Sequence, residues 1–121
     1  MNTNRIYCEA AKSSSLNTSA QIRRIPIDRN MKLESVLICP RSNITADNTN
    51  YSKIQFKNGS TVIAERSFQT DDLAADTSEA LAISGTPELS ALEEIQVYYV
   101  AAGNGLAIDL DCLLVLSPAR G

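Results

Sequence analysis

Histidine is absent from all 121 residues of the chain. Without an imidazole there is no standard Ser-His-Asp triad, no Cys-His pair and no His-ligated zinc site. The five glycines form neither a G-x-G-x-x-G run nor a P-loop, so the sequence gives no support for nucleotide binding. We therefore expect no enzyme, no catalytic residue, no cofactor and no metal site.

Two groups of carboxylates are the remaining candidates for chemistry. Asp109 and Asp111 share one face of a predicted strand, about 7 Å apart, and such a pair suits acid-base catalysis only when it lies in a cleft. Asp71, Asp72 and Asp76 offer oxygen ligands for a hard cation, but they lack the ligand order and the glycine of a calcium loop. We interpret the first group as a stripe facing solvent or a partner, and the second as a solvated turn.

Cysteines are few and long apolar runs are lacking. Cys8, Cys39 and Cys112 are too widely spaced for a metal knuckle, and an odd number gives no disulfide framework. The last two fall within apolar strand patterns, where a free cysteine packs as a small hydrophobic residue. The apolar stretches are of strand length, so no membrane span is expected, and no apolar segment of the signal-peptide kind follows Met1.

The sequence is instead rich in residues that alternate between polar and apolar, and one hairpin shows this most clearly. In residues 51–57, Ile54 and Phe56 point to one side, and lysines and a glutamine point to the other. This period of two predicts a strand with one buried face. Asn58-Gly59 follows, before a second apolar run at 61–64, and this dipeptide predicts a two-residue type I′ turn.

The same pattern predicts further strands at 20–27, 31–39, 80–83, 95–101 and 106–116. Met31, Leu33, Leu37 and Cys39 are expected on one face of the second of these. Its other face is apolar too, which indicates a central or covered strand.

In the last strand Leu110 and Leu114 are expected to face the core, and Asp109 and Asp111 lie opposite. Residues 87–94 are expected to form a single turn that buries Leu89 and Leu92. Seven or eight strands without a strong helix predict an all-β antiparallel sandwich.

The chain is expected to be one β-sandwich domain at residues 20–121, preceded by an N-terminal arm. Residues 1–19 contain few large apolar side chains. They are therefore predicted to lie outside the core as an extended arm, with a short strand at 5–11 as one possibility, and to order on binding a partner.

Charge is unevenly distributed along the chain. Residues 1–66 hold ten basic and five acidic side chains, whereas residues 67–121 hold one basic and nine acidic ones. The basic residues are dispersed, unlike the dense patch of a nucleic-acid reader. Contact with an acidic protein surface, such as a sister subunit, and ordinary solvated charge are both compatible with this distribution.

The segments S-V-L-I-C-P at 35–40 and T-A-D-N-T-N-Y at 45–51, together with the strand rhythm of about residues 30–118, resemble small β-sandwich proteins of tailed-bacteriophage virions. The resemblance is to capsid decoration, or cement, proteins. It implies a jelly-roll fold, a location on the capsid surface after synthesis in the host cytoplasm, the major capsid protein as partner, and a homo-oligomer, with a trimer favoured. Neither nucleic-acid nor membrane binding is expected, because the basic residues are dispersed and the apolar stretches are of strand length.

We therefore expect a structural virion protein that binds and stabilises a phage head. The alternative is a glycan- or receptor-binding sandwich of a head fibre or tail. Tryptophan is absent and aromatic content is 5%, which disfavours the alternative because sugar platforms use exposed aromatic rings. The candidate contact residues for the capsid or a sister subunit are Arg5, Tyr7, Lys12, Arg23, Arg24 and Arg29.

Overall fold

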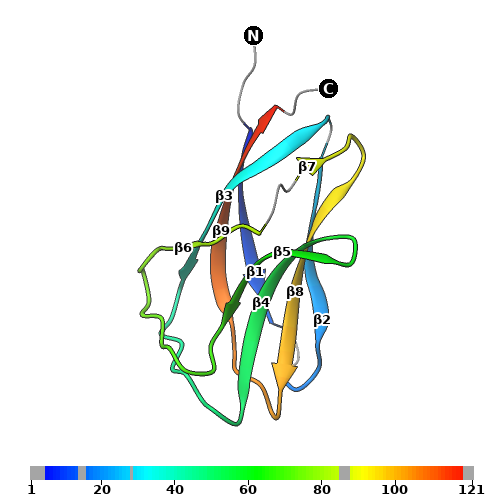
Figure 1. Ribbon diagram of the computed structural model, residues 1–121. Coiled ribbons are helices and arrows are strands. Elements are labelled where there is room, and N and C mark those ends of the chain that lie inside the picture. The colour runs from blue at the N-terminus through cyan, green and yellow to red at the C-terminus, as the bar shows by residue number, and fades with distance from the viewer. Residues whose placement is uncertain (1–4, 14–15, 28, 85–87, 119–121) are drawn as a thin grey trace.

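The computed structural model describes residues 5–13, 16–27, 29–84 and 88–118 as two antiparallel sheets packed face to face (Figure 1). Among these residues no helix is long and apolar enough to cross a membrane. The strands are β1 (Arg5–Lys12), β2 (Ala20–Pro26), β3 (Met31–Pro40), β4 (Tyr51–Asn58), β5 (Thr61–Ser67), β6 (Glu79–Leu81), β7 (Glu88–Leu89), β8 (Glu94–Ala102) and β9 (Asp109–Pro118).

The pairing of the strands is nested. β4 pairs with β5, β3 with β6, β2 with β8 and β1 with β9, so the chain folds like one long hairpin. This hairpin is wrapped into sheet A, in the order β1-β9-β3-β6 with β7 also on β3, and sheet B, in the order β2-β8-β4-β5. Eight strands arranged in this way form a jelly roll, which confirms the predicted all-β antiparallel sandwich.

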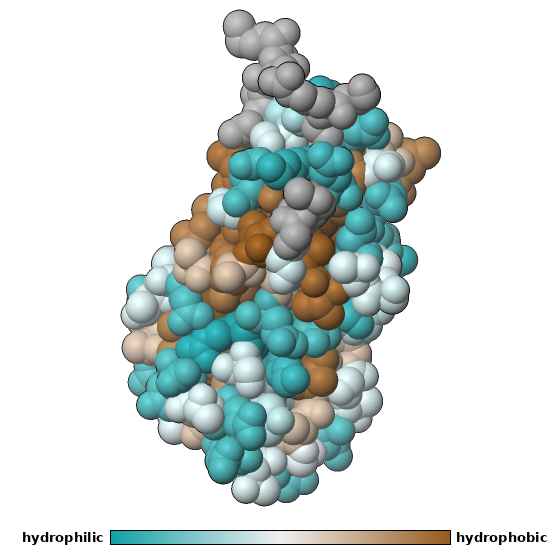
Figure 2. Space-filling model, in the orientation of Figure 1, coloured by the Kyte–Doolittle hydropathy of each residue, from teal (hydrophilic) through white to brown (hydrophobic). Residues whose placement is uncertain are grey.

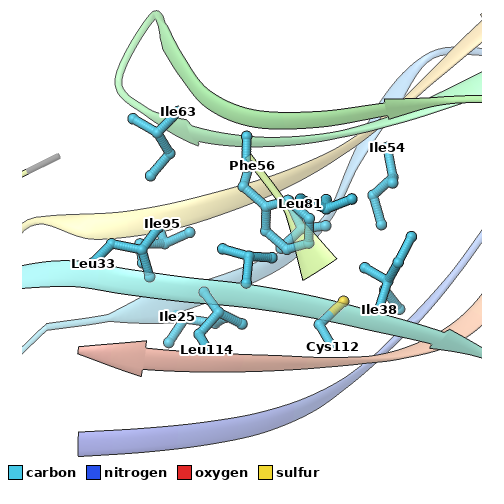
Figure 3. Packing of buried hydrophobic residues seen from close by; sticks show 14 of the residues in the cluster. Ile25, Leu33, Ile38, Ile54, Phe56, Ile63, Leu81, Ile95, Cys112 and Leu114 are labelled. Carbon is cyan, nitrogen blue, oxygen red and sulfur yellow. The ribbon is translucent and has the colours of Figure 1, made fainter. Parts of the chain in front are cut away.

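The core lies between the two sheets and is built from alternate residues of each strand. Figure 3 shows Ile54 and Phe56 of β4 opposite Ile38 of β3 and Leu114 of β9, all of them buried. Leu110 and Leu114 are completely buried, so the predicted register of the last strand is correct. The period-two pattern was sufficient here because β9 runs through the core without a register shift on its β1 side.

β3 departs from its predicted faces because it contains a bulge. Its pairing with β9 shifts between Leu33 and Ser35, so the side that faces the core changes there. Met31 and Leu33 point into the core as expected. Beyond the bulge, Val36 and Ile38 are buried in place of Leu37 and Cys39. The inference of a central strand is correct, since β3 lies between β9 and β6.

The hairpin of β4 and β5 forms as predicted, but its turn is of another type. Asn58 pairs with Thr61, so Gly59 and Ser60 are the two turn residues. Only Gly59 has a positive φ, of 64°, which is typical of type II′ rather than type I′. A bulge in β5 follows, and it explains why the consecutive residues Ile63 and Ala64 are both buried.

The segment before β8 contains the expected turn, at Ala91 and Leu92 with a hydrogen bond from the Glu93 amide to the Ser90 carbonyl at 3.1 Å, and the two-residue strand β7 precedes it. Leu89 is buried and pairs with Met31, which confirms half of the prediction. Leu92, however, is 91% exposed and has a φ of 72°. The left-handed backbone at this residue turns its side chain to solvent instead of under the sheet.

Residues 5–12 form part of the sandwich. β1 pairs with β9 over its whole length, from Arg5↔Leu116 to Lys12↔Asp109, and Ala11 is buried in the core. The expectation of an arm outside the core is therefore wrong for these residues. Cross-strand hydrogen bonds fix an edge strand that carries little apolar bulk of its own.

A buried polar network holds the connections at one end of the sandwich. The Leu106 amide donates to the Ser52 hydroxyl at 2.7 Å, Ser52 donates to the Tyr99 hydroxyl at 2.9 Å, and Tyr99 donates to the Leu16 carbonyl at 2.6 Å. Gly105 lies against this network. A Cβ there would lie 1.8 Å from the Leu16 carbonyl oxygen, so a side chain cannot fit without displacing backbone.

Candidate interaction surface

The outer face of sheet A is apolar at its centre. We define it by six side chains on three adjacent strands: Ile6 and Cys8 on β1, Leu37 and Cys39 on β3, and Leu113 and Val115 on β9. Pairing brings them together, since Leu113 lies opposite both Cys8 and Leu37, and Val115 lies opposite Ile6. Ile6 is 66% exposed and Cys8 is exposed too. The four side chains on β3 and β9 are partly exposed.

Two features of the sequence produce this face. The bulge in β3 directs Leu37 and Cys39 outward, as described above. In β9 the run Leu113-Leu114-Val115-Leu116 is apolar at every position, so it places apolar side chains on both faces. A shallow groove of about 200 Å³ lies on this surface between β1, β9 and β3, with Cys8, Leu37 and Cys39 among its lining residues.

The outer face of sheet B provides the contrast. Its outward-facing positions are partly exposed and mostly polar: Tyr51, Lys53, Gln55 and Lys57 on β4, and Glu94, Gln96, Tyr98 and Val100 on β8. A solvated sheet normally shows this polar alternation. The apolar outer face of sheet A therefore sets the two sheets apart.

Charged side chains flank the apolar centre at the Lys12 end of β1. Arg41 donates to Asp111 at 2.7 Å and lies 3.7 Å from Asp109. The hydrogen bond that Arg41 donates to Asp111, together with the charges of both carboxylates, raises the pKa of Arg41. The carboxylates considered above as an acid-base pair are thus an exposed ion-pair cluster, which agrees with their interpretation as an outer stripe.

The acidic loop after β5 is organised around Arg66. The guanidinium donates to Glu79 at 2.6 Å and to the carbonyls of Asp71 and Asp72 at 3.0 and 3.1 Å, and it stacks on the Phe68 ring. This cation already occupies the backbone oxygens of the loop. Among the described residues there is no group of three side chains suited to a metal ion.

Ion pairs within the chain account for part of the charge asymmetry. Arg24 lies 3.9 Å from Glu94, Arg41 contacts Asp111, and Arg66 contacts Glu79. Each of these pairs joins a basic residue of the first part to an acidic residue of the second. Nested pairing places the two parts of the chain side by side, so the opposite charges meet within one molecule.

The six predicted contact residues are distributed over β1, β2 and the turn after β2. Tyr7 points inward and packs against the core, and Arg23 is bound to Glu9 across the two sheets at 2.9 Å. Arg24 is exposed on β2.

The other three predicted contact residues lie elsewhere. Lys12 is exposed at the end of β1, and Arg29 is exposed in the turn before β3. Arg5 begins β1, and its side chain lies outside the described residues. The structure does not gather the six into one patch, and their role in binding stays a prediction.

No protein-family model matches the chain, and no curated protein matches it. Among solved structures, the chain is similar to the structure of the infectious bursal disease virus Gx strain, with a TM-score of 0.48 and 11% identity over 98% of this chain and 34% of that one. It is also similar to the VP2 subviral particle of infectious bursal disease virus, with a TM-score of 0.45 and 12% identity over 93% and 32%. The chain spans about a third of each. Likeness at this level carries no argument about function.

The cysteines occupy two different environments. Cys112 is buried in the core, and this burial raises the pKa of its thiol to about 12. Cys8 is exposed and Cys39 is partly exposed, both on the outer face of sheet A, and all three are free thiols. The expectation that Cys112 packs as a small hydrophobic residue is confirmed. Cys39 lies on the other side of its sheet because of the bulge in β3.

The outer face of sheet A was not among the residues predicted to bind a partner. Its signals were nevertheless in the sequence: a strand at 31–39 that is apolar on both sides, and four consecutive apolar residues at 113–116. The first predicts a central or covered strand, but pattern alone cannot tell a covered face from an exposed one. Figure 2 shows one side of the molecule, on which apolar side chains gather in the middle of the view, with hydrophilic ones above and below them.

Proposed function

We propose that this chain is a non-enzymatic structural protein of a virion, of the capsid-decoration type. It binds the major capsid protein of a tailed-phage head through the outer face of sheet A and stabilises the assembled shell. Jelly rolls are common among viral capsid proteins and lectins, so the fold is compatible with this role without establishing it.

The observation that carries the proposal is the difference between the two outer faces. Leu37, Leu113 and Val115 form an apolar centre on sheet A, and Lys12, Lys32 and Arg41 lie at its ends. An apolar centre with a charged rim is the usual anatomy of a protein–protein interface. In sheet B, by contrast, the central strand β4 presents Lys53, Gln55 and Lys57 on its outer face.

An enzyme is disfavoured by the same side chains. The carboxylates Asp109 and Asp111 are occupied by Arg41, and the carbonyls of the acidic loop are occupied by Arg66. Decoration needs no reactive group. It needs one complementary surface repeated over the lattice, because many modest contacts acting together give high avidity.

The proposal is tested with heads of the phage that encodes the protein, assembled without it. The purified chain is mixed with these heads, and the bound fraction is measured after sedimentation. We expect the wild type and Gln55→Asp to bind, because Gln55 lies on the outer face of sheet B. Leu113→Asp is expected to lose binding, because it places a charge at the centre of the apolar face.

Circular dichroism and thermal melts must show that both variants are folded. Equal binding by both variants would place the contact elsewhere on the molecule. Failure of the wild type to bind would contradict decoration itself.

The alternative of a glycan- or receptor-binding module stays a prediction. Tyr51 and Tyr98 are partly exposed rings on the outer face of sheet B, and the Lys57 ammonium lies 4.4 Å from the centroid of Tyr98. This cation covers a ring that a sugar would have to stack upon. No feature of the described residues favours the alternative over decoration.

A further inference from the structure

The four lateral edges of the two sheets are protected to different degrees. β6 at one edge of sheet A is only three residues long. In sheet B, β2 carries Pro26, two exposed arginines and a register shift, and the β5 edge receives the Ser84 amide on its Ile63 carbonyl at 2.9 Å. Short length, proline, charge, bulges and covering segments are the means by which proteins block edge-to-edge pairing.

β1 has fewer of these protections, since only its charged residues Arg5, Glu9 and Lys12 oppose pairing. It is eight residues long, contains no proline, and pairs with β9 in an unbroken register. Its exposed face carries Ile6, which is 66% exposed. Among the described residues no strand pairs with its outer edge. A strand of this length that lacks a strand partner on one edge is a template for another strand.

We infer that β1 pairs with β1 of a second copy of this chain, antiparallel and about a two-fold axis perpendicular to sheet A. The two copies of sheet A then form one continuous sheet. The inference goes beyond the proposed function, since it concerns self-association in the absence of a head. It also differs from the trimer implied by the resemblance, because a two-fold ladder is complete with two copies.

The two-fold axis restricts the register. The axis keeps the outer faces of the two copies on the same side. Two paired residues must therefore both point outward or both point inward, so their sequence numbers add up to an even value. A sum of 16 places Cys8 opposite Cys8 of the second copy, Ile6 opposite Ala10, and Tyr7 opposite Glu9. Arg5 then lies opposite Ala11, so a large side chain meets a small one there, and residues 5–11 of β1 take part.

The neighbouring registers are poorer. A sum of 18 places Glu9 directly opposite Glu9, and like charges in that position are destabilising. A sum of 14 pairs only residues 5–9 of the strand. In the favoured register Glu9 keeps its ion pair with Arg23, at 2.9 Å within its own chain.

The arrangement also extends the surface described above. Ile6, Cys8, Leu113 and Val115 of one copy continue across the ladder into the same residues of the second. The apolar outer face is thereby doubled, and it can bind two neighbouring sites at once. Two linked sites raise the effective affinity without new contacts.

Cys8 gives a direct test of the register. Residues opposite each other in an antiparallel ladder have Cα atoms about 4.5 or 5.5 Å apart, and both distances suit a disulfide. Oxidised glutathione is added to the full-length Cys39→Ser variant. The two Cys8 thiols lose two protons and two electrons to form one S–S bond, and glutathione is reduced to two thiols.

Two measurements decide the inference. Light scattering under reducing conditions at high micromolar concentration should give twice the chain mass of 13.1 kDa. Peptide mapping after oxidation should find a Cys8–Cys8 bridge. Cys8→Lys brings two like charges together at the axis and should halve the mass, whereas Ala80→Lys, at the opposite edge of sheet A, should leave it unchanged.

A wild-type mass of one or three chains overturns the inference, and so does a dimer that Cys8→Lys leaves intact. These results are separable from the proposed function, because no head is present. A monomer that still sediments with heads would overturn only the two-fold pairing. A dimer that does not sediment with them would overturn only the decoration role.

Discussion

Leu113 and Leu114 are neighbours on β9 that point to opposite faces, and truncating each in turn separates folding from binding. Leu114 is fully buried between the sheets, opposite Val36 of β3 and Tyr7 of β1. Leu114→Ala removes three heavy atoms from a closed core, which should cost about 2–5 kcal/mol of unfolding free energy. Leu113→Ala leaves no enclosed cavity and should cost about 1 kcal/mol or less.

The assay is urea unfolding followed by circular dichroism, with all proteins at one concentration because association adds to apparent stability. The midpoint should fall far more for Leu114→Ala, with the slope unchanged. Head binding should respond in the opposite sense, weakening for Leu113→Ala and persisting for folded Leu114→Ala. Equal losses of stability would refute the reasoning, since a one-residue slip exchanges the two faces.

Gly105→Ala should unfold or severely destabilise the protein, because its Cβ would overlap backbone, whereas Gly59→Ala, with a positive φ but nothing within 4 Å, should cost only about 1–2 kcal/mol in the same urea assay. Hydrogen bonds from two backbone amides lower the pKa of Asp47. Its ionised carboxylate therefore contributes fully to folding stability above the unfolded pKa near 3.8, and this contribution is lost as the pH falls through the folded pKa. The Asp47→Asn variant should therefore lose less stability than the wild type as the pH falls through the folded-state pKa of Asp47. Burial raises the pKa of Cys112 to about 12, so stability should decline as the pH rises from about 9 towards 12, and Cys112→Val should remove that decline. At pH 8 a thiol reagent should modify Cys8 and spare Cys112 until denaturant is added.

Local patterns predicted much of the fold because most strands bury one face and leave the other in contact with solvent. In β4 and β9 the alternation alone identified the buried side chains, including Ile54 and Leu114. The errors occurred where one residue changes the phase. The bulge between Leu33 and Ser35 reverses β3, and a bulge of this kind has no reliable signature in a single sequence.

The N-terminal strand could not be assigned from composition because its stability is supplied by β9. Residues 5–12 bury little except Ala11, yet every one of them pairs across the ladder. The partner strand β9 lies about a hundred residues away in the chain. A pairing over so long a separation produces no recognisable pattern in residues 5–12 themselves. The same nested pairing explains why opposite charges from distant segments, such as Arg41 and Asp111, meet within one chain.

The apolar outer face of sheet A was hidden from sequence analysis for a related reason. Leu37 and Leu113 have the residue types of a core, and only the strand order shows that no further sheet among the described residues covers them. The acidic residues that drew attention as candidates for chemistry are instead held by Arg41 and Arg66. Which side chains are occupied and which are available depends on the three-dimensional pairing.

The most direct test of the central claim is a cryo-electron microscopy reconstruction of phage heads saturated with this protein. The account predicts ordered density for the jelly roll on the capsid exterior, with Leu37, Leu113 and Val115 of sheet A against the major capsid protein and the lysines of β4 exposed to solvent. Density in which sheet B or the connecting loops contact the shell, with the outer face of sheet A left bare, would contradict it.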